Sequence, residues 1–287
     1  MAQVQRRLAN MTRILNMPVK VDRNGTRAQV TIPGLSYDDF DRTGKIQLMR
    51  VCRLLESLRI VMVMQWKHLF NVDPTADLQF LVGTRYEFSD HLHDEIKCAH
   101  KPFEMVGYYG HCGSSSYEHI TSIISSHTKQ ELAKCIGKVV YIDKRTRRPK
   151  NLPAGIIVAL KRFAPKSALI TKFKPLVLPE DDVCIFKKGF DVLPSDLDYN
   201  DHTNHASYAK YCCDFATLVA ANGKFKHIPK DFESMRLKSY SNWFLGESLV
   251  SDKLHVLFWE DLENKRQINF EIKNQEASIL QSTMELY

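Results

Sequence analysis

The sequence lacks several features that would place it in common protein classes. No apolar run is longer than residues 60–64, whereas a helix needs about 20 apolar residues to cross a bilayer, so an integral membrane protein is excluded. The chain contains neither Gly-x-x-x-x-Gly-Lys nor Gly-x-Gly-x-x-Gly, which disfavours enzymes that bind nucleotides in such loops. Gly-x-Ser-x-Gly is missing too, so an α/β-hydrolase would have no nucleophile elbow.

Cysteine usage bears on the compartment. The seven cysteines are odd in number and follow no disulfide-scaffold spacing, which indicates free thiols in a reducing environment. We therefore expect a cytoplasmic protein without a signal peptide. Residues 1–21 carry four basic and no acidic side chains, so a mitochondrial presequence is the alternative, although serine is missing there.

Composition and charge are those of an ordinary folded protein. The chain is 44% hydrophobic and 25% charged over 287 residues, which allows one large domain or two smaller ones. The net charge of +7 suits anionic ligands such as phosphates. Because the basic residues are scattered and rarely alternate with aromatic ones, we expect no nucleic-acid partner.

The pattern of apolar residues predicts the same order of elements twice. In each half a strand and a loop precede a long helix, predicted over residues 46–66 and 202–221, and further strands follow it. The predicted strands are 27–32, 78–88, 103–109, 117–125 and 138–142 in the first half, and 182–193, 237–243, 254–260, 267–272 and 277–286 in the second.

An ungapped alignment supports an internal duplication. An offset of 157 residues places residues 39–41 (Asp-Phe-Asp) over residues 196–198 (Asp-Leu-Asp), each ahead of a predicted helix. We predict an α+β fold, a tandem or double hotdog in which two antiparallel sheets each wrap a long central helix. The expected parts are a basic extension (1–24), an N-terminal hotdog (25–160), a connector (161–180) and a C-terminal hotdog (181–287).

The polar residues that precede the second helix form the strongest candidate site. Asp198, Asn200 and His202 stand at i, i+2 and i+4 where a loop enters a helix. Amides at a helix start favour negative charge and a neutral imidazole. In the simpler alternative, Asn200 or Asp201 only caps the helix, and Asp198 only satisfies amides of the loop. The same offset puts Thr43 over Asn200 and Lys45 over His202, so we expect one active site per chain, in the second half.

Here the sequence resembles a known family. Residues 196–208 read Asp-Leu-Asp-x-Asn-x-His-x-Asn-x-x-x-Tyr, which is similar to the active-site motif of the plant and bacterial acyl-acyl-carrier-protein (acyl-ACP) thioesterases. Residues 146–148 (Thr-Arg-Arg) and 244–248 (Phe-Leu-Gly-Glu-Ser) match two further family segments, Thr-Arg-Arg and Tyr-Arg-Arg-Glu-Cys. The resemblance covers nearly the whole chain from about residue 25 and is strongest over residues 190–260. It implies a double hotdog with one catalytic half.

The resemblance also implies roles for single residues. The family's catalytic Asp, Asn, His and Glu fall on Asp198, Asn200, His202 and Glu247. Ser248 stands where the family has a cysteine, so a cysteine-based mechanism at that position is excluded. His205 stands where a second asparagine is usual.

Thioester hydrolysis needs a nucleophile, a polarised carbonyl group and a protonated leaving group. We expect Asp198 to attack directly or to position water, and Asn200 to orient Asp198 or the water. We expect His202 to carry the proton and Glu247 to act as base or to orient His202. We expect a backbone amide near Thr203 or Asn204 to polarise the carbonyl group. The acyl chain would lie between helix and sheet, where Tyr208, Trp243 and Phe244 are candidates.

The resulting prediction is a thioesterase that hydrolyses fatty acyl-CoA or acyl-ACP to free fatty acid and thiol without a cofactor, with a homodimer possible. The alternative is a catalytically inactive hotdog that binds acyl chains or serves in assembly. A hotdog dehydratase would need a histidine and an acid on facing halves, which Lys45 disfavours. The residues His91, His93, Cys98, His100, His111 and Cys112 match no structural zinc-finger spacing, so we expect no metal.

Overall fold

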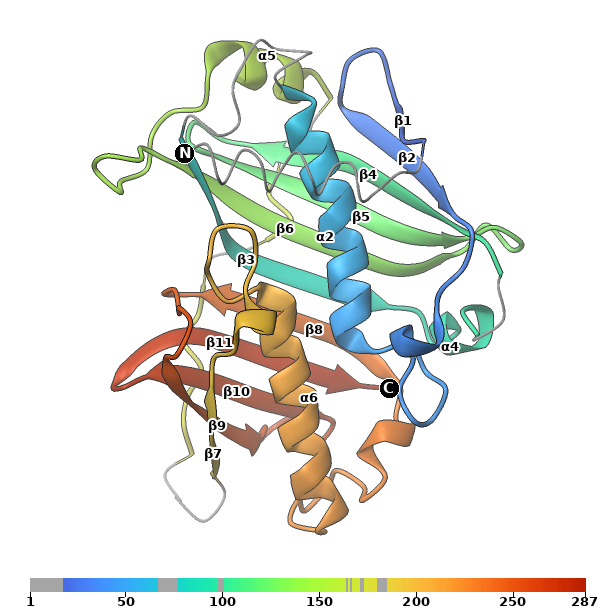
Figure 1. The fold of residues 1–287 in the computed structure, drawn as a ribbon, viewed down its shortest axis with the longest axis vertical. Coiled ribbons are helices and arrows are strands. Elements are labelled where there is room, and N and C mark those ends of the chain that lie inside the picture. The colour runs from blue at the N-terminus through green and yellow to red at the C-terminus, as the bar shows by residue number, and fades with distance from the viewer. Residues whose placement is uncertain are drawn as a thin grey trace. The chain divides into compact units, whose positions relative to one another are not determined.

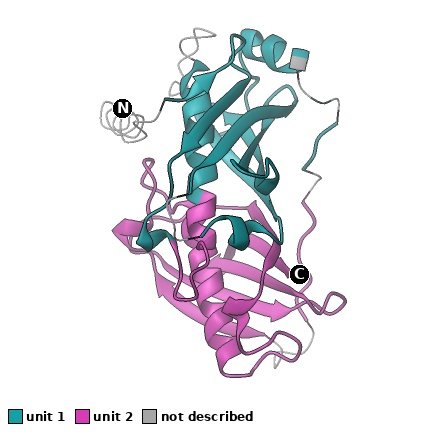
Figure 2. Ribbon diagram, turned by 90° about the vertical axis from the view of Figure 1, so that its right-hand side faces the viewer, with its two compact units in different colours: residues 1–39, 53–172 teal, residues 40–52, 173–287 magenta. Residues whose placement is uncertain are grey.

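The computed structural model describes residues 18–66, 77–97, 101–163, 165, 167–170, 173–179 and 185–287. The chain divides into two compact units, one of residues 1–39 and 53–172 and one of residues 40–52 and 173–287 (Figure 2). Across the described residues, no helix is both long and apolar enough to cross a bilayer.

The first unit is built around an antiparallel sheet. Its strands run in the order β1-β2-β4-β5-β6-β3, and helix α2 (Leu48–Met64) lies along one face from residue 53 onward (Figure 1). Gly107 permits this close approach, because a Cβ atom there would meet the side chains of Met62 and Leu58. The strands are β1 (Lys20–Val21), β2 (Arg27–Ile32), β3 (Leu78–Phe88), β4 (Phe103–Cys112), β5 (Ser116–Ser125) and β6 (Glu131–Ile142).

The second unit repeats this design. Its antiparallel strands run in the order β8-β11-β10-β9-β7, beside helix α6 (His205–Ala221) (Figure 1). The ring of Phe190 stacks on Tyr211 of the helix at 3.8 Å, and Phe258 and Phe270 are fully buried. The strands are β7 (Phe186–Asp191), β8 (Leu237–Phe244), β9 (Lys253–Glu260), β10 (Gln267–Asn274) and β11 (Ala277–Leu286).

Short helices occupy several of the loops. In the first unit these are η1 (Tyr37–Asp39), α4 (Leu92–Glu95) and α5 (Ala154–Phe163). In the second unit they are η3 (Pro194–Asp196) before α6 and η4 (Phe232–Ser234) after it.

The segment expected as a connector is held to the sheets by buried side chains. In the first unit, the carboxylate of Glu118 on β5 accepts hydrogen bonds from the amides of Leu169 and Ile170 at 2.8–3.0 Å. In the second unit, Oε1 of Gln281 on β11 accepts one from the amide of Leu176 at 2.8 Å. Side chains buried on a sheet face thus satisfy backbone groups that run over it.

The observed elements agree with the predicted α+β class and with a long helix beside antiparallel strands in each half, the hotdog arrangement. The division into two separate sheets is not confirmed. The prediction missed α5, whose apolar face covers β4, because residues 154–163 directly follow a charged, proline-bounded stretch. Most of the expected N-terminal extension, residues 1–17, lies outside the described residues, and the predicted domain boundaries stay predictions.

Candidate functional site

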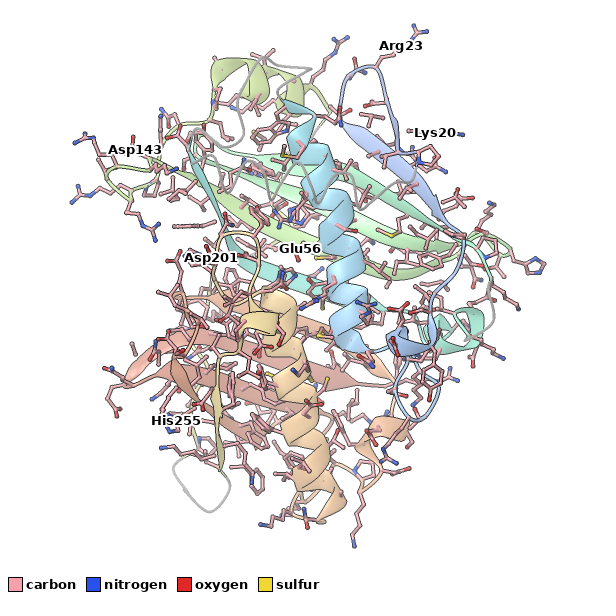
Figure 3. The ribbon with its side chains drawn as sticks, viewed as in Figure 1. Lys20, Arg23, Glu56, Asp143, Asp201 and His255 are labelled. Atoms are coloured by element: carbon pink, nitrogen blue, oxygen red, sulfur yellow. The ribbon has the colours of Figure 1, made fainter. Side chains whose placement is uncertain are left out.

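The candidate residues lie on a tight turn, residues 197–203, between η3 and α6. Leu197 and Thr203 form an antiparallel bridge, and the amide of Asp198 donates to the carbonyl oxygen of His202 at 2.8 Å. Asp201 closes the turn with a positive φ of 64°, which a non-glycine residue rarely adopts, and it lies on the loop that enters α6 (Figure 3). The turn therefore places residues 198 and 202 opposite each other.

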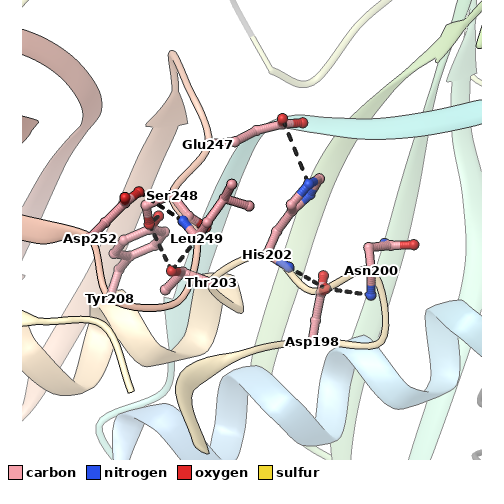
Figure 4. Close-up of polar contacts among 9 residues, drawn as sticks. All are labelled: Asp198, Asn200, His202, Thr203, Tyr208, Glu247, Ser248, Leu249 and Asp252. Atoms are coloured by element: carbon pink, nitrogen blue, oxygen red, sulfur yellow. Dashed lines mark hydrogen bonds and ion pairs between the residues drawn. The ribbon is translucent and has the colours of Figure 1, made fainter. Parts of the chain in front are cut away.

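The carboxylate of Asp198 is directed into the turn itself. Its Oδ1 accepts hydrogen bonds from the amide of Asn200 at 2.7 Å and from the amide of His202 at 3.3 Å (Figure 4). Asn200 contacts Asp198 through its backbone, while the residue as a whole is exposed. Asp198 thus fixes the main chain of both other polar residues of the motif.

The imidazole of His202 meets Glu247, which follows β8. His202 Nε2 and Glu247 Oε2 are 3.8 Å apart (Figure 4). The side chain of His202 is 30% exposed and that of Glu247 is 36% exposed. This separation is longer than a hydrogen bond but within the range of an ion pair once the ring is protonated. The structure thus brings together two of the residues onto which the family's catalytic residues fall.

A buried cluster of three hydroxyl groups joins the His202 turn to the Glu247 loop. Ser248 Oγ lies 2.7 Å from both Thr203 Oγ1 and Tyr208 OH, and the Thr203 amide donates to the Ser248 carbonyl oxygen at 2.9 Å. Thr203 directly follows His202, and Ser248 directly follows Glu247, so these bonds set the distance between the catalytic candidates. From the sequence, Ser248 stood out only as the residue in place of a cysteine, and its position next to Glu247 was the available signal of its role.

The start of α6 departs from the prediction. The helix begins at His205, and Asn204 is its N-cap, accepting from the Ala206 amide at 2.8 Å. The amide of Asn204 donates to the Asp196 carbonyl oxygen at 2.8 Å, and that of Thr203 to Ser248. Both amides expected to polarise a substrate carbonyl group are therefore already used. Capping falls to Asn204, not to Asn200 or Asp201.

The aromatic candidates lie on different faces of the sheet. Ser282, opposite Asn242 on β8, lies 4.0 Å from the Cys212 thiol of α6. Phe244, two residues after Asn242, shares that helix-facing side and lies 6.3 Å from the His205 ring. Trp243 must point to the other side.

Trp243 there packs against Phe173, with ring centroids 5.5 Å apart, and so does not lie between helix and sheet as expected. Tyr208 is buried on α6, and this burial raises the pKa of its hydroxyl group.

The first half contains the same turn over residues 40–46. Phe40 bridges Ile46, and the Asp41 amide donates to the Lys45 carbonyl oxygen at 2.8 Å. Asp41 Oδ1 accepts from the amides of Thr43 and Lys45 at 2.8 and 3.0 Å. Gly44, with φ of 79°, occupies the position of Asp201. The alignment at an offset of 157 thus pairs residues that make the same backbone bonds and the same bonds from amides to an aspartate.

Lys45, where the second turn has His202, serves a different purpose. Its ammonium group donates to the backbone carbonyl oxygens of Glu233, Ser234 and Met235, at 2.8 Å for Glu233 and 3.2 Å for Met235. This caps the carboxyl end of η4. Burial lowers the pKa of Lys45.

The remaining candidate residues lie in the first half of the chain. Within the described ranges, no three His, Cys, Asp or Glu side chains gather to hold a metal ion. His91 lies 3.4 Å from Asp90, while Cys98 and His100 lie outside the described residues. The Thr-Arg-Arg stretch is an exposed turn in which Arg147 packs over the ring of Phe80.

Comparisons with known proteins give similar folds at low sequence identity. No family model matches the chain, and no curated protein matches its sequence. An acyl-ACP thioesterase from Bacteroides thetaiotaomicron has a TM-score of 0.71 and 14% identity, over 93% of this chain and 100% of its own. A putative oleoyl thioesterase from Lactobacillus plantarum has a TM-score of 0.70 and 14% identity, over 94% and 96%.

The 12:0-ACP thioesterase from Umbellularia californica has a TM-score of 0.66 and 15% identity, over 91% of this chain and 97% of its own. The predicted resemblance to acyl-ACP thioesterases is therefore confirmed as a shared fold that extends over almost the whole length of both chains.

Proposed function

We propose that this protein is a thioesterase that hydrolyses fatty acyl thioesters, carried by CoA or acyl carrier protein, to free fatty acid and thiol. The observation that carries the proposal is that the imidazole of His202 lies beside the carboxylate of Glu247. The matching turn of the first half has Lys45 in the position of His202. A shared fold alone does not specify chemistry, whereas an imidazole beside a carboxylate can accept and return a proton. The similar thioesterase structures support the same reaction class.

The reaction proceeds by attack of water on the thioester carbonyl carbon. His202 accepts the proton that the water loses, and the carboxylate of Glu247, 3.8 Å from Nε2, stabilises the imidazolium ion that forms. The carbon–sulfur bond then breaks, and His202 returns the proton to the departing sulfur. One water is consumed, and one carboxylic acid and one thiol are released. The carboxamide of Asn200 orients the water or the carbonyl oxygen.

The acyl chain lies beside the helix-facing side of the sheet. Phe244 is placed there, close to the start of α6. Trp243 packs on the opposite side against Phe173, so we do not assign it to the acyl chain. Thr203 and Tyr208 support the site through Ser248, and Asn204 supports it by capping α6.

The test measures thiol release from acyl-CoA and acyl-ACP substrates of several chain lengths. His202→Ala and Glu247→Gln should each lower kcat, His202→Ala by about a hundredfold or more, the usual range for an acid–base group. Lys45→Ala, at the matching position of the first half, should leave kcat within about twofold of wild type, because the Lys45 ammonium group donates to carbonyl oxygens at the carboxyl end of η4. Thiol release that His202→Ala does not reduce would contradict the proposal and favour an acyl-binding module.

A further inference from the structure

We propose a second binding site, on the face of the second unit's sheet that is turned away from α6, for a phosphate monoester such as that of a nucleotide. The site is a hollow between β7, the edge strand, and β9, and Gly189 forms its floor. It uses none of the residues of the catalytic turn. Its existence is therefore independent of the proposed function, and only the source of its ligand bears on that function.

The hollow is small. It has a volume of about 250 Å³ and is lined by Gly189, Phe190, Asp191, Lys253, Leu254 and His255. Gly189 and His255 are partners across β7 and β9, and His255 lies at this edge of the sheet (Figure 3). Pockets for drug-sized ligands typically have about 300–1,000 Å³, so this space suits a small polar head group.

Strand alternation places the polar side chains of the hollow on the face away from α6. Phe190 stacks on Tyr211 of α6, and its cross-strand partner Leu254 is fully buried. Side chains alternate between the two faces along a strand, so the neighbours of these two residues lie on the opposite face. These neighbours are Gly189 and Asp191 on β7, and Lys253 and His255 on β9.

Three basic side chains surround the floor. Lys253 and His255 stand two residues apart on β9, a spacing of about 7 Å along a strand, and Lys187 stands two residues before Gly189 on β7. Among the residues that the structure describes, none of these three side chains takes part in a salt bridge or a side-chain hydrogen bond. Their donors are therefore available to an anion.

The floor itself is open because residue 189 has no side chain. A Cβ atom on Gly189 would lie 3.7 Å from Cδ2 and 3.9 Å from Nε2 of His255, so one edge of the imidazole faces this space. A phosphate monoester carries a charge of about −1.5 to −2 at neutral pH and three strong acceptor oxygens. Lys253 and His255 can each donate to one of these oxygens.

The acidic side chains on this face decide which anion fits. Glu271 Oε2 lies 3.6 Å from the ammonium group of Lys273, which balances its charge. Asp191 lies at one end of the hollow. A carboxylate repels a bare anion but accepts a hydrogen bond from a hydroxyl group. We therefore expect an ester that carries a hydroxyl group beside the phosphate, as ribose does, to bind more tightly than inorganic phosphate.

The first experiment fills the hollow without changing a charge. An added Cβ atom on Gly189 makes only ordinary contacts, and valine suits a strand, so Gly189→Ala and Gly189→Val should melt no lower than wild type. Titration calorimetry should show that adenosine 3′,5′-bisphosphate binds to wild type and that its affinity falls with the size of the added side chain, by about tenfold or more for Gly189→Val.

The matched variants remove a charge inside and outside the hollow. Lys253→Met should weaken binding of the bisphosphate by about tenfold, the usual effect of losing one hydrogen bond to a charged group. Lys265→Met, at an exposed lysine after β9, should leave binding unchanged. The proposal is overturned if wild type does not bind the bisphosphate at millimolar concentration, if Gly189→Val binds it as wild type does, or if adenosine binds as tightly.

Thiol-release kinetics identify the source of the phosphate. If the ligand is the 3′-phosphate end of CoA, Gly189→Val should raise KM for acyl-CoA about tenfold and leave kcat and the KM for acyl-ACP unchanged. If the ligand is a separate nucleotide, both KM values stay unchanged while the loss of bisphosphate binding remains. A wild-type protein that binds the bisphosphate but releases no thiol retains this site and refutes the proposed function.

Discussion

Replacement of Ser248 by alanine tests whether the buried hydroxyl cluster fixes the site. The Ser248 hydroxyl group is bonded at 2.7 Å to both Thr203 Oγ1 and Tyr208 OH, and Ser248 is 1% exposed. Each such bond contributes about 0.5–1.5 kcal/mol net. The substitution should therefore lower the free energy of unfolding by about 1–3 kcal/mol, while the backbone bond from the Thr203 amide to residue 248 remains.

A double-mutant cycle with Tyr208→Phe isolates one of these bonds. Because the two hydroxyl groups contact each other directly, the effects of the two substitutions should be less than additive by about 1 kcal/mol. Urea denaturation of the four proteins gives this coupling energy. Ser195→Ala, at an exposed serine of η3, should change the stability by less than about 0.5 kcal/mol.

The same variant should also affect turnover. With the cluster opened, the Glu247 loop is held less firmly to the His202 turn, so we expect kcat to fall about tenfold with KM little changed. A coupling energy of zero, or a Ser248→Ala protein with unchanged stability and unchanged kcat, would refute the reasoning that Ser248 sets the distance between His202 and Glu247.

Two further predictions concern buried parts of the chain. Gly137→Ala should lower the free energy of unfolding by about 1–3 kcal/mol, because the added Cβ atom would overlap the buried ring of His119. Gly155→Ala in α5 should not destabilise the protein, because a Cβ atom there meets nothing within 4 Å. Equal effects of the two substitutions in urea titrations would contradict this prediction. Burial raises the pKa of Cys135 and Cys212 to about 12, so at pH 8 neither should react with iodoacetamide until the protein unfolds; mass spectrometry after native alkylation would detect the contrary result.

The sequence was sufficient to predict most of the fold because its apolar spacing follows the burial pattern. The second helix was expected over residues 202–221 and runs from His205 to Ala221, and β3 has the predicted bounds of residues 78–88. The error at the helix start arose because several adjacent polar residues can act as N-cap, and only the structure shows that Asn204 does so.

The site was predictable in its residues and less so in their roles. The motif and the offset of 157 identified Asp198, Asn200 and His202 as candidates where a loop enters the second helix. Their spacing contains no information on where a carboxylate points, and only the structure shows that Asp198 Oδ1 accepts from two amides of its own turn. The side of the sheet on which Trp243 lies depends on strand register and on Phe173, which is distant in the sequence.

The two matching turns show that one backbone arrangement accepts different side chains at the same position. In each turn the defining bonds come from the backbone and from one aspartate. Lys45 in the first turn and His202 in the second contribute to these bonds only through their main-chain atoms. The side chain at this position is therefore open to mutation without loss of the turn. One turn carries an imidazole beside a carboxylate and the other carries a lysine that caps a short helix, and both are built on the same backbone.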